Sequence, residues 1–385
     1  MKFSSKGENE MSEIRNKIIT ISGEPRSGKS TVVKEIVKKY QQLGFKVHVI
    51  ETGKIFRERS EQEYLKMYPD RTDINQADIQ DDETFAKKRA EIDAAIDGWI
   101  AQLGEEINSE EKPNDVYIID SRLAWHNIPS SFAVRLTVDE TIAGQRALKD
   151  KSKGSQDSYV TVEEATEKTK QRKIGEIRRY KQRYGVDLTD IENYNLVADT
   201  SYSNTEELAQ IIIDGEQAYR EEKEYPKMWA SPAILLSEQR ARSTYNEKVD
   251  KLVDIINHSG YEAVEGTLQI AENEGVKILL NGNHRVCAGL STGKTLFPYE
   301  IIHKDDKESQ RIANLIYDDP TLECVYDWAD TLNYYGVEKG KIESFKKGFV
   351  TKELIAVSKA PKLRKIFGLD KTKDEAKMEQ DGEDR

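Results

Sequence analysis

The chain has 385 residues, of which 37% are hydrophobic and 34% charged, and its formal net charge is −11. This length predicts two domains with appended segments, and no apolar run approaches the ~18 residues that cross a bilayer. The negative charge disfavours a protein that coats nucleic acid by bulk attraction, and two cysteines without a CxxC pair, Cys287 and Cys324, disfavour a disulfide framework or a structural zinc site.

The first elements of the chain alternate between strand and helix. Residues 1–14 are polar, lack the apolar stretch of a signal peptide and are predicted to be a disordered tail, and the scarcity of cysteines fits a reducing cytoplasm. Lys17–Ser22 predicts a short apolar strand, Thr31–Leu43 a helix with apolar residues at helical spacing, and Lys46–Ile50 a second strand. A strand, a glycine-rich loop, a helix and a strand in this order predict a βαβ unit and therefore a parallel sheet.

The same α/β domain is predicted to extend over residues 15–215. Its further elements are expected to be strands at Val116–Asp120, Phe132–Leu136 and Leu196–Ala198, a helix around Ile92–Leu103, a polar loop at about 150–160 and a charged helix at about 164–184.

The stretch GEPRSGKS, Gly23–Ser30, fits the phosphate-binding pattern GxxxxGK[ST], with a strand before it and a helix after it. Glycines let backbone N–H groups face phosphate oxygens, and the helix N-terminus adds partial positive charge. We expect Lys29 to reach the β- and γ-phosphates of ATP and the Ser30 hydroxyl to bind Mg²⁺. The residues expected to bind the nucleotide are Gly23, Arg26, Ser27, Gly28, Lys29, Ser30 and Thr31.

Later stretches of the chain carry a more specific pattern. They are ETGKIFRERS (51–60), EIDAAIDGWI (91–100), IIDSRLAW (118–125) and RKIGEIRRYKQRYGVDLTDIENYNLVADTS (172–201). With them, residues 15–215 resemble the cytidylate kinases of the archaeal type, a branch of the nucleoside-monophosphate kinases. The resemblance implies a three-layer α/β fold with a five-stranded parallel sheet, an acceptor-binding segment and a mobile lid.

The resemblance implies where the phosphoryl acceptor binds. Thr52, Gly53 and Arg57 match the segment that holds the acceptor nucleotide. Asp93 and Asp97 match acidic positions near the acceptor base, although a surface salt bridge is the alternative for both.

The resemblance also implies three arginines at the phosphates. Arg122 matches an arginine that contacts the acceptor phosphate, and Arg172 and Arg179 match arginines that return from the lid toward the transferring phosphates. Guanidinium groups suit phosphate oxygens and stabilise transition-state charge. The alternative for Arg172, Arg178, Arg179 and Arg183 is a solvated helix face.

The sequence departs from the family pattern at the acceptor side. Ser121 stands where the family usually has a glycine, and Asp150 stands where the lid usually carries an arginine. Asp120 ends a strand beside the phosphate-binding loop and is expected either to support Mg²⁺ through its bound water or to act as a general base. An ionised phosphate acceptor needs no base, whereas a base accelerates transfer to a hydroxyl by about 10²–10⁴. His126 is a second candidate base.

A second, smaller α+β domain is predicted at 229–303, after a charged linker at 216–228. The stretches SPAILLS, KVDKLVDIINHSGY, LLNGNHRVCAG and LFPYEII resemble the ParB/sulfiredoxin-like fold. The resemblance implies a phosphate site at Gly282, Asn283, His284 and Arg285. Asn283 replaces the cysteine that sulfiredoxin chemistry needs, and a domain that only packs or dimerises is the alternative. A helical extension at 304–368 and a disordered tail at 369–385 are expected to follow.

These features together predict an ATP- and Mg²⁺-dependent phosphotransferase. The preferred acceptor is the hydroxyl of a 5-hydroxymethylpyrimidine in DNA, as in phage DNA hypermodification, where the base has to be flipped out of the duplex. Basic segments at 172–183 and 361–365 would then offset the acidic net charge locally. The alternatives are a kinase of free CMP or dCMP and a nucleotide-gated DNA-binding switch, and no membrane partner is expected.

Overall fold

The computed structural model describes residues 16–71, 74, 78–79, 82–150, 159–237, 247–273, 276–302 and 323–324. The tails predicted at 1–14 and 369–385 lie outside these residues. So do the loop at 151–158 and the helical extension at 304–368, apart from the two-residue strand β11 (Glu323–Cys324). No helix in the described part of the chain combines the length and the apolarity that a bilayer crossing requires.

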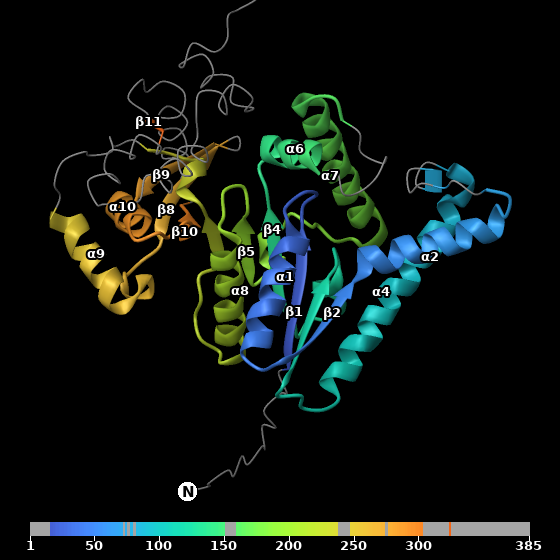
Figure 1. Ribbon diagram of the computed structural model, residues 1–385, viewed down its shortest axis with the longest axis horizontal. Helices are drawn as coiled ribbons and strands as arrows, with labels where there is room; N and C mark the ends of the chain where they lie inside the picture. Colours follow the sequence, from blue (N-terminus) through green and yellow to red (C-terminus); the bar gives the residue numbers. More distant parts are fainter. Residues whose placement is uncertain are drawn as a thin grey trace, which may run out of the picture.

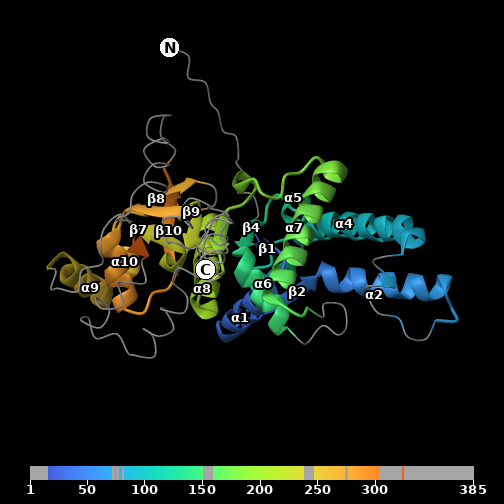
Figure 2. The same ribbon diagram turned by 90° about the horizontal axis from the view of Figure 1, so that it is seen from above.

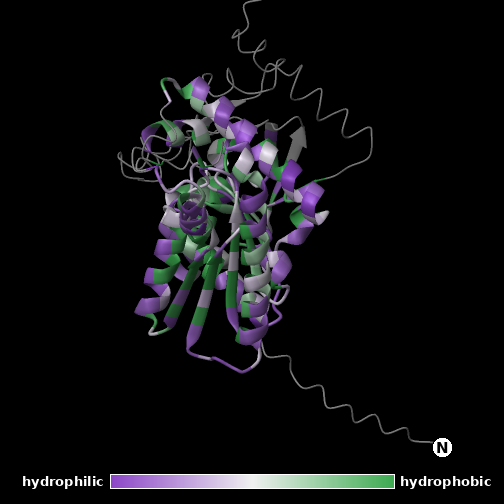
Figure 3. Ribbon diagram, turned by 90° about the vertical axis from the view of Figure 1, so that its right-hand side faces the viewer, coloured by the Kyte–Doolittle hydropathy of each residue, from purple (hydrophilic) through white to green (hydrophobic). Residues whose placement is uncertain are grey.

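Five parallel strands form the first half of the sheet. They are β1 (Lys17–Gly23), β2 (Lys46–Glu51), β3 (Asp115–Asp120), β4 (Phe132–Thr137) and β5 (Leu196–Asp199), in the order β2–β3–β1–β4–β5. The central strands are apolar on both faces, as a parallel sheet covered by helices requires (Figure 3). The predicted α/β fold with a parallel sheet is confirmed.

Alternate residues of β1 pack into two different cores. Ile19 and Ile21 pack against α1 (Lys29–Gln42) and α8 (Thr205–Arg220) on one face. Ile18 packs on the other face, where α4 (Ala86–Asn108) and the short α5 (Ala124–Asn127) contribute apolar residues. Because side chains alternate along a strand, this pattern places the sheet between two helical layers.

Three more helices and two short 3₁₀ turns complete the described residues of this half. Helix α2 (Thr52–Met67) follows β2 directly and extends beside α4 as a helical arm (Figure 2). Helices α6 (Glu140–Lys149) and α7 (Val162–Tyr184) pack on each other above the carboxyl ends of the strands (Figure 1). The 3₁₀ turns are η1 (Glu83–Phe85) and η3 (Ile191–Asn193).

The sheet continues into the second half of the chain through β6 (Met228–Ala230), which is parallel to β5 and antiparallel to β10 (Phe297–Ile301). Beyond β10 come β8 (Leu268–Asn273), β9 (Val276–Asn281), β7 (Leu235–Ser237) and β11, so the described residues form one eleven-stranded sheet. Helices α9 (Glu247–Ser259) and α10 (Asn283–Ser291) share a core with these strands, and η4 (Pro232–Ile234) and η5 (Tyr261–Ala263) complete the unit.

Side-chain contacts as well as strand pairing connect the two halves. Trp229 of β6 and Leu296, which precedes β10, both pack into the core under α1 and α8. Glu207 of α8 accepts hydrogen bonds from the backbone N–H of Thr295 at 2.8 Å and of Leu296 at 3.3 Å, and pairs with Lys294 at 3.4 Å. The loop before β10 is therefore fixed to a helix of the first half.

Two segments differ from their predictions. The linker expected at 216–228 begins inside α8, where Glu216 is 1% exposed and accepts hydrogen bonds from Tyr40 at 3.2 Å and Arg220 at 2.5 Å. The strand expected over 231–237 is limited to β7, because Pro232, which lacks an N–H for strand pairing, begins the 3₁₀ turn η4.

Candidate active site

The loop between β1 and α1 has the backbone of a phosphate cradle. Gly28 adopts φ 78° at the N-cap of α1, and no side chain caps that helix end. The N–H groups of the first turn therefore remain available to an anion. A Cβ at Gly23 would lie 2.7 Å from Ser27 Oγ and 3.0 Å from Lys29 Cδ, so the loop closes tightly only with glycine there.

Arg26 is an exception in this loop, because it adopts φ 64° without being glycine. The left-handed conformation costs a residue with a Cβ about 1–2 kcal/mol. Two contacts hold it in place: Asp150 Oδ2 lies 2.5 Å from Arg26 Nη1, and Arg146 Nη1 donates to the Arg26 carbonyl at 3.1 Å.

Lys29 and Asp120 meet at the carboxyl edge of the sheet. Asp120 lies in register with Ile21 of β1 and Glu51 of β2, and its Oδ1 is 3.4 Å from Lys29 Nζ. Burial, and then the nearby cation of Arg122, lower the pKa of Lys29 to about 8, although the Asp120 carboxylate opposes the shift. Because Lys29 is close to losing its proton in the free site, bound phosphates would stabilise its charged form.

Arg122 and Arg172 meet at one carboxylate, that of Glu176 on α7. Arg122 donates to Glu176 from Nε at 2.8 Å and from Nη2 at 3.4 Å, and Arg172 donates from Nε at 3.2 Å. Burial alone would raise the pKa of Glu176, but the Arg122 guanidinium holds it below its ordinary value. The same pair raises the pKa of Arg122 against the effect of burial. The exposed Arg179 lies over the ring of Tyr180, with its guanidinium carbon 5.3 Å from the ring centroid.

The start of α2 adjoins this cluster. Thr52 Oγ1 donates to the Asp120 carbonyl at 3.1 Å. The guanidinium of the exposed Arg57 folds back toward Gly53, where a Cβ would lie 3.5 Å from Arg57 Nη1. Ser121 is 7% exposed and its hydroxyl accepts from Leu123 N at 3.4 Å, so it supports the turn that carries Arg122.

The two acidic residues of α4 contact α7. Asp93 pairs with Arg183 at 2.9 Å, and Asp97 accepts a hydrogen bond from the hydroxyl of Tyr184. Burial raises the pKa of Asp97. These contacts join α4 to α7, the helix that carries Glu176, and the exposed His126 acts on Asp97 only through its charge.

The structure thus brings together the loop, Asp120, Arg122, Arg172 and the start of α2. Residues 22–166 match the family model of the AAA domain. A cytidylate kinase of Methanocella arvoryzae is 33% identical over 196 residues, which are 51% of this chain and 94% of that protein. The chain belongs to the cytidylate kinase family.

Two other relatives match the same half of the kinase. A cytidylate kinase of Methanopyrus kandleri is 30% identical over 203 residues, which are 51% of this chain and 90% of that protein. An S-adenosylmethionine-dependent nucleotide dehydratase of Lacinutrix mariniflava is 30% identical over 196 residues, which are 51% of this chain and 35% of that protein. The predicted nucleoside-monophosphate-kinase-like domain in the N-terminal half is therefore confirmed.

The kinase is a P-loop phosphotransferase that uses ATP and Mg²⁺, and its residues fit both. The uncapped start of α1, Gly23 and Lys29 suit a triphosphate. Ser30 at the start of α1 would hold Mg²⁺, and the Asp120 carboxylate is placed to serve either the metal or the acceptor; the described residues contain no cluster of three or more metal-ligating side chains. Mg²⁺ normally keeps several waters and binds mainly through substrate phosphates, so few protein ligands are needed.

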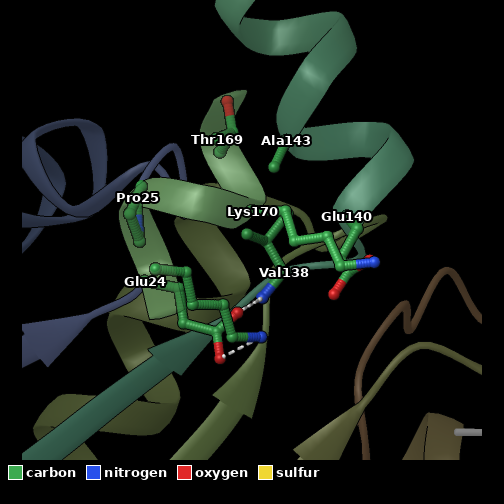
Figure 4. Close-up of a pocket in the computed structure, with 8 residues that line it drawn as sticks. Glu24, Pro25, Val138, Glu140, Ala143, Thr169 and Lys170 are labelled. Carbon is green, nitrogen blue, oxygen red and sulfur yellow. Dashed lines mark hydrogen bonds and ion pairs between the residues drawn. The ribbon is translucent and has the colours of Figure 1, made fainter. Parts of the chain in front are cut away.

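A buried charge cluster behind the loop was not predicted. Glu24, 9% exposed, pairs with Arg135 of β4 at 3.3 Å and Lys173 of α7 at 2.9 Å. Its other oxygen accepts from Val138 N at 3.4 Å (Figure 4). The kinase thereby ties its phosphate-binding loop to both the sheet and α7. An arginine inside the apolar strand FAVRLT is the sequence signal for such a partner.

In the second half of the kinase, Gly282 caps α10 with φ 117°, and a Cβ there would lie 2.4 Å from Leu268 Cδ2. Asn283 and His284 begin α10, and Arg285 Nη1 donates to the Glu265 carbonyl at 3.2 Å. All four predicted residues thus lie at one helix N-terminus.

Proposed function

We propose that this kinase transfers the γ-phosphoryl group of ATP to the hydroxyl of a 5-hydroxymethylpyrimidine in DNA. Residues 15–215 would carry the chemistry, and residues 229–303, as a ParB/sulfiredoxin-like domain, would hold the DNA. The observation that carries the proposal is the second half of the sheet: relatives matched over 90% or more of their own length cover only 51% of this chain. A kinase of free nucleotides has little need for an added unit.

The residues of the site suit a hydroxyl acceptor. The hydroxyl oxygen forms a bond to the γ-phosphorus, the bond from that phosphorus to the bridging oxygen breaks, and the electron pair stays on ADP. Asp120 takes the proton of the hydroxyl, and Lys29, 3.4 Å away, moves onto the phosphates. Glu176 already pairs with the charge of Arg122, so Arg122 does not require an anionic acceptor as its partner.

The second half supplies groups that suit a DNA backbone. The N-terminus of α10 has no side-chain cap, and Asn283, His284 and Arg285 lie in its first turn. Backbone N–H groups at a helix start and an arginine are contacts that proteins use to position DNA phosphates. A base in a duplex would reach Asp120 only after flipping out of the stack.

Free CMP or dCMP is the second candidate acceptor. The family membership favours it, because the relatives from Methanocella and Methanopyrus are cytidylate kinases. In that reaction Arg57 and Arg122 would bind the acceptor phosphate, Glu176 would release Arg122, and Asp120 would act at Mg²⁺ rather than as a base.

Transfer of ³²P from γ-labelled ATP distinguishes the candidates. The acceptors are CMP, dCMP, thymine DNA and the same DNA containing 5-hydroxymethyluracil, and the product is digested to locate the label. We expect label only in the hydroxymethylated DNA. Label in CMP or dCMP alone would overturn the proposal in favour of the second candidate.

Two variants test the roles of the residues in whichever transfer is found. Lys29→Ala should abolish labelling of every acceptor. Asp120→Asn should lower transfer to a hydroxyl by about 10²–10⁴ if the carboxylate is the base. Asp115→Asn, at the opposite end of β3, is the matched control and should leave transfer unchanged. Full activity of Asp120→Asn with hydroxymethylated DNA would refute the general-base role.

A further inference from the structure

The phosphate-binding loop places an arginine at a position whose left-handed backbone conformation is unfavourable for a residue with a Cβ. Arg26 is one of two non-glycine residues with positive φ among the described residues, and it lies between the glycines that shape the phosphate cradle. Backbone strain of this kind is most often retained at functional sites. A glycine at position 26 would remove the strain, so the arginine side chain itself requires an explanation.

Arg26 is held through its side chain and through its backbone. The side chain is 11% exposed, and its guanidinium pairs with Asp150, the C-cap residue of α6, at 2.5 Å. Its carbonyl accepts from Arg146 Nη1, and Arg146 Nη2 also donates to the Thr200 carbonyl at 2.5 Å. Arg26 is therefore fixed at the loop before any nucleotide binds, and its position depends on α6.

We infer that Arg26 is a catalytic residue of the phosphoryl transfer and that Asp150 is its positioning residue. During transfer an acceptor oxygen bonds to the γ-phosphorus, the bond to the β–γ bridging oxygen breaks, and its electron pair stays on ADP; the proton of a hydroxyl acceptor leaves to Asp120. The guanidinium of Arg26 stabilises the negative charge on the γ-phosphoryl oxygens and the bridging oxygen. Asp150 holds that guanidinium at the loop so that little reorganisation is needed.

The role is distinct from that of Lys29. Lys29 is a compact cation paired with Asp120 at the acceptor edge, whereas Arg26 carries a planar fork on the opposite, α6 side of the loop. The two cations together would enclose the transferring group. The inference requires only that the kinase transfers a phosphoryl group from ATP, and it is independent of which acceptor the kinase uses.

Binding of a transition-state mimic tests the inference without an acceptor. ADP with aluminium fluoride and Mg²⁺ imitates the transferring phosphoryl group, whereas ADP alone does not. We expect Arg26→Gly to weaken binding of the fluoride complex by about 10²–10³ and to change the affinity for ADP by less than threefold. Arg26→Lys should fall between the two, because it keeps the charge and loses the fork.

A variant with the arginine moved from position 26 to position 150 gives the most specific test. Because Arg26 and Asp150 are in contact, an arginine at position 150 can occupy the same place. Arg26→Gly combined with Asp150→Arg should restore fluoride-complex binding to within about tenfold of the wild type, whereas Asp150→Asn alone should weaken it about tenfold. Lys149→Ala, an exposed cation next to Asp150, is the control and should have no effect.

Several results would overturn the inference. One is wild-type binding of the fluoride complex by Arg26→Gly. Another is an equal loss of ADP affinity, because a merely structural role would weaken both ligands. If Arg26→Gly does not fold, as measured by its thermal unfolding, Arg26→Lys and Asp150→Asn decide: unchanged fluoride-complex binding in both would refute the role.

Discussion

The affinity of the kinase for ATP should fall as the pH rises from 7 to 9, because of Lys29. Its pKa is lowered to about 8 in the free protein, chiefly by burial and then by Arg122. The charged fraction is then about 0.9 at pH 7 and about 0.1 at pH 9. Bound phosphates require the charged form, so above pH 8 the protein must take up a proton when ATP binds. The expected loss of affinity is about tenfold, or about 1.4 kcal/mol.

Isothermal titration calorimetry in buffers of different ionisation enthalpy measures both quantities. Proton uptake on binding MgATP should rise from about 0.1 at pH 7 to about 0.9 at pH 9. Lys29→Arg is the matched control, because arginine stays charged throughout and its affinity should be independent of pH over this range. Asp120→Asn removes a group that raises the pKa of Lys29 and should shift the loss of affinity to lower pH.

An affinity that is constant within twofold from pH 7 to 9, with no proton uptake, would refute this reasoning. The same shift acts on stability with the opposite slope. Between the folded pKa of about 8 and the unfolded pKa near 10.5, the unfolded chain binds more protons than the folded one. The contribution of Lys29 to the free energy of unfolding therefore increases with pH in this window.

Three further predictions concern other parts of the kinase. Glu24→Gln should lower the free energy of unfolding by about 3 kcal/mol in urea, because Arg135 stays buried without its carboxylate, and Glu24→Gln with Arg135→Met should recover most of that loss. Gly282→Ala should destabilise the protein by about 1–3 kcal/mol because of its φ of 117°, whereas Gly98→Ala, with open space around its Cβ, should not. Cys287, with its pKa raised to about 12 by burial, should react with iodoacetamide at pH 8 only after unfolding, and rapid labelling of Cys287 in the native protein, distinguished from Cys324 by peptide mass spectrometry, would contradict its buried position.

The sequence predicts the local parts of this structure well. Apolar runs and a glycine pattern predict the phosphate-binding loop and β1 to β5, and the predicted bounds agree with the observed ones to within a few residues. Lys29 follows β1 and Asp120 ends the neighbouring parallel strand β3, so the two residues meet at the same edge of the sheet.

Contacts between distant residues account for what the sequence does not predict. Glu24 and Arg135 are 111 residues apart and Arg122 and Glu176 are 54 apart, so no local pattern joins them. Likewise β6 is only three residues long, and its strand identity comes from pairing with β5 and β10 rather than from alternation.

The central position of β6 also matters for how the kinase can be divided. Its partner β5 would become an edge strand in any fragment that stops before Lys227, with the N–H of Val197 no longer bonded to the Lys227 carbonyl. Trp229 and Leu296 would be missing from the first core. Exposed edges and incomplete cores promote aggregation. In this kinase the second half therefore covers the edge of the first, and we expect a fragment that stops before Lys227 to aggregate more readily than the full chain.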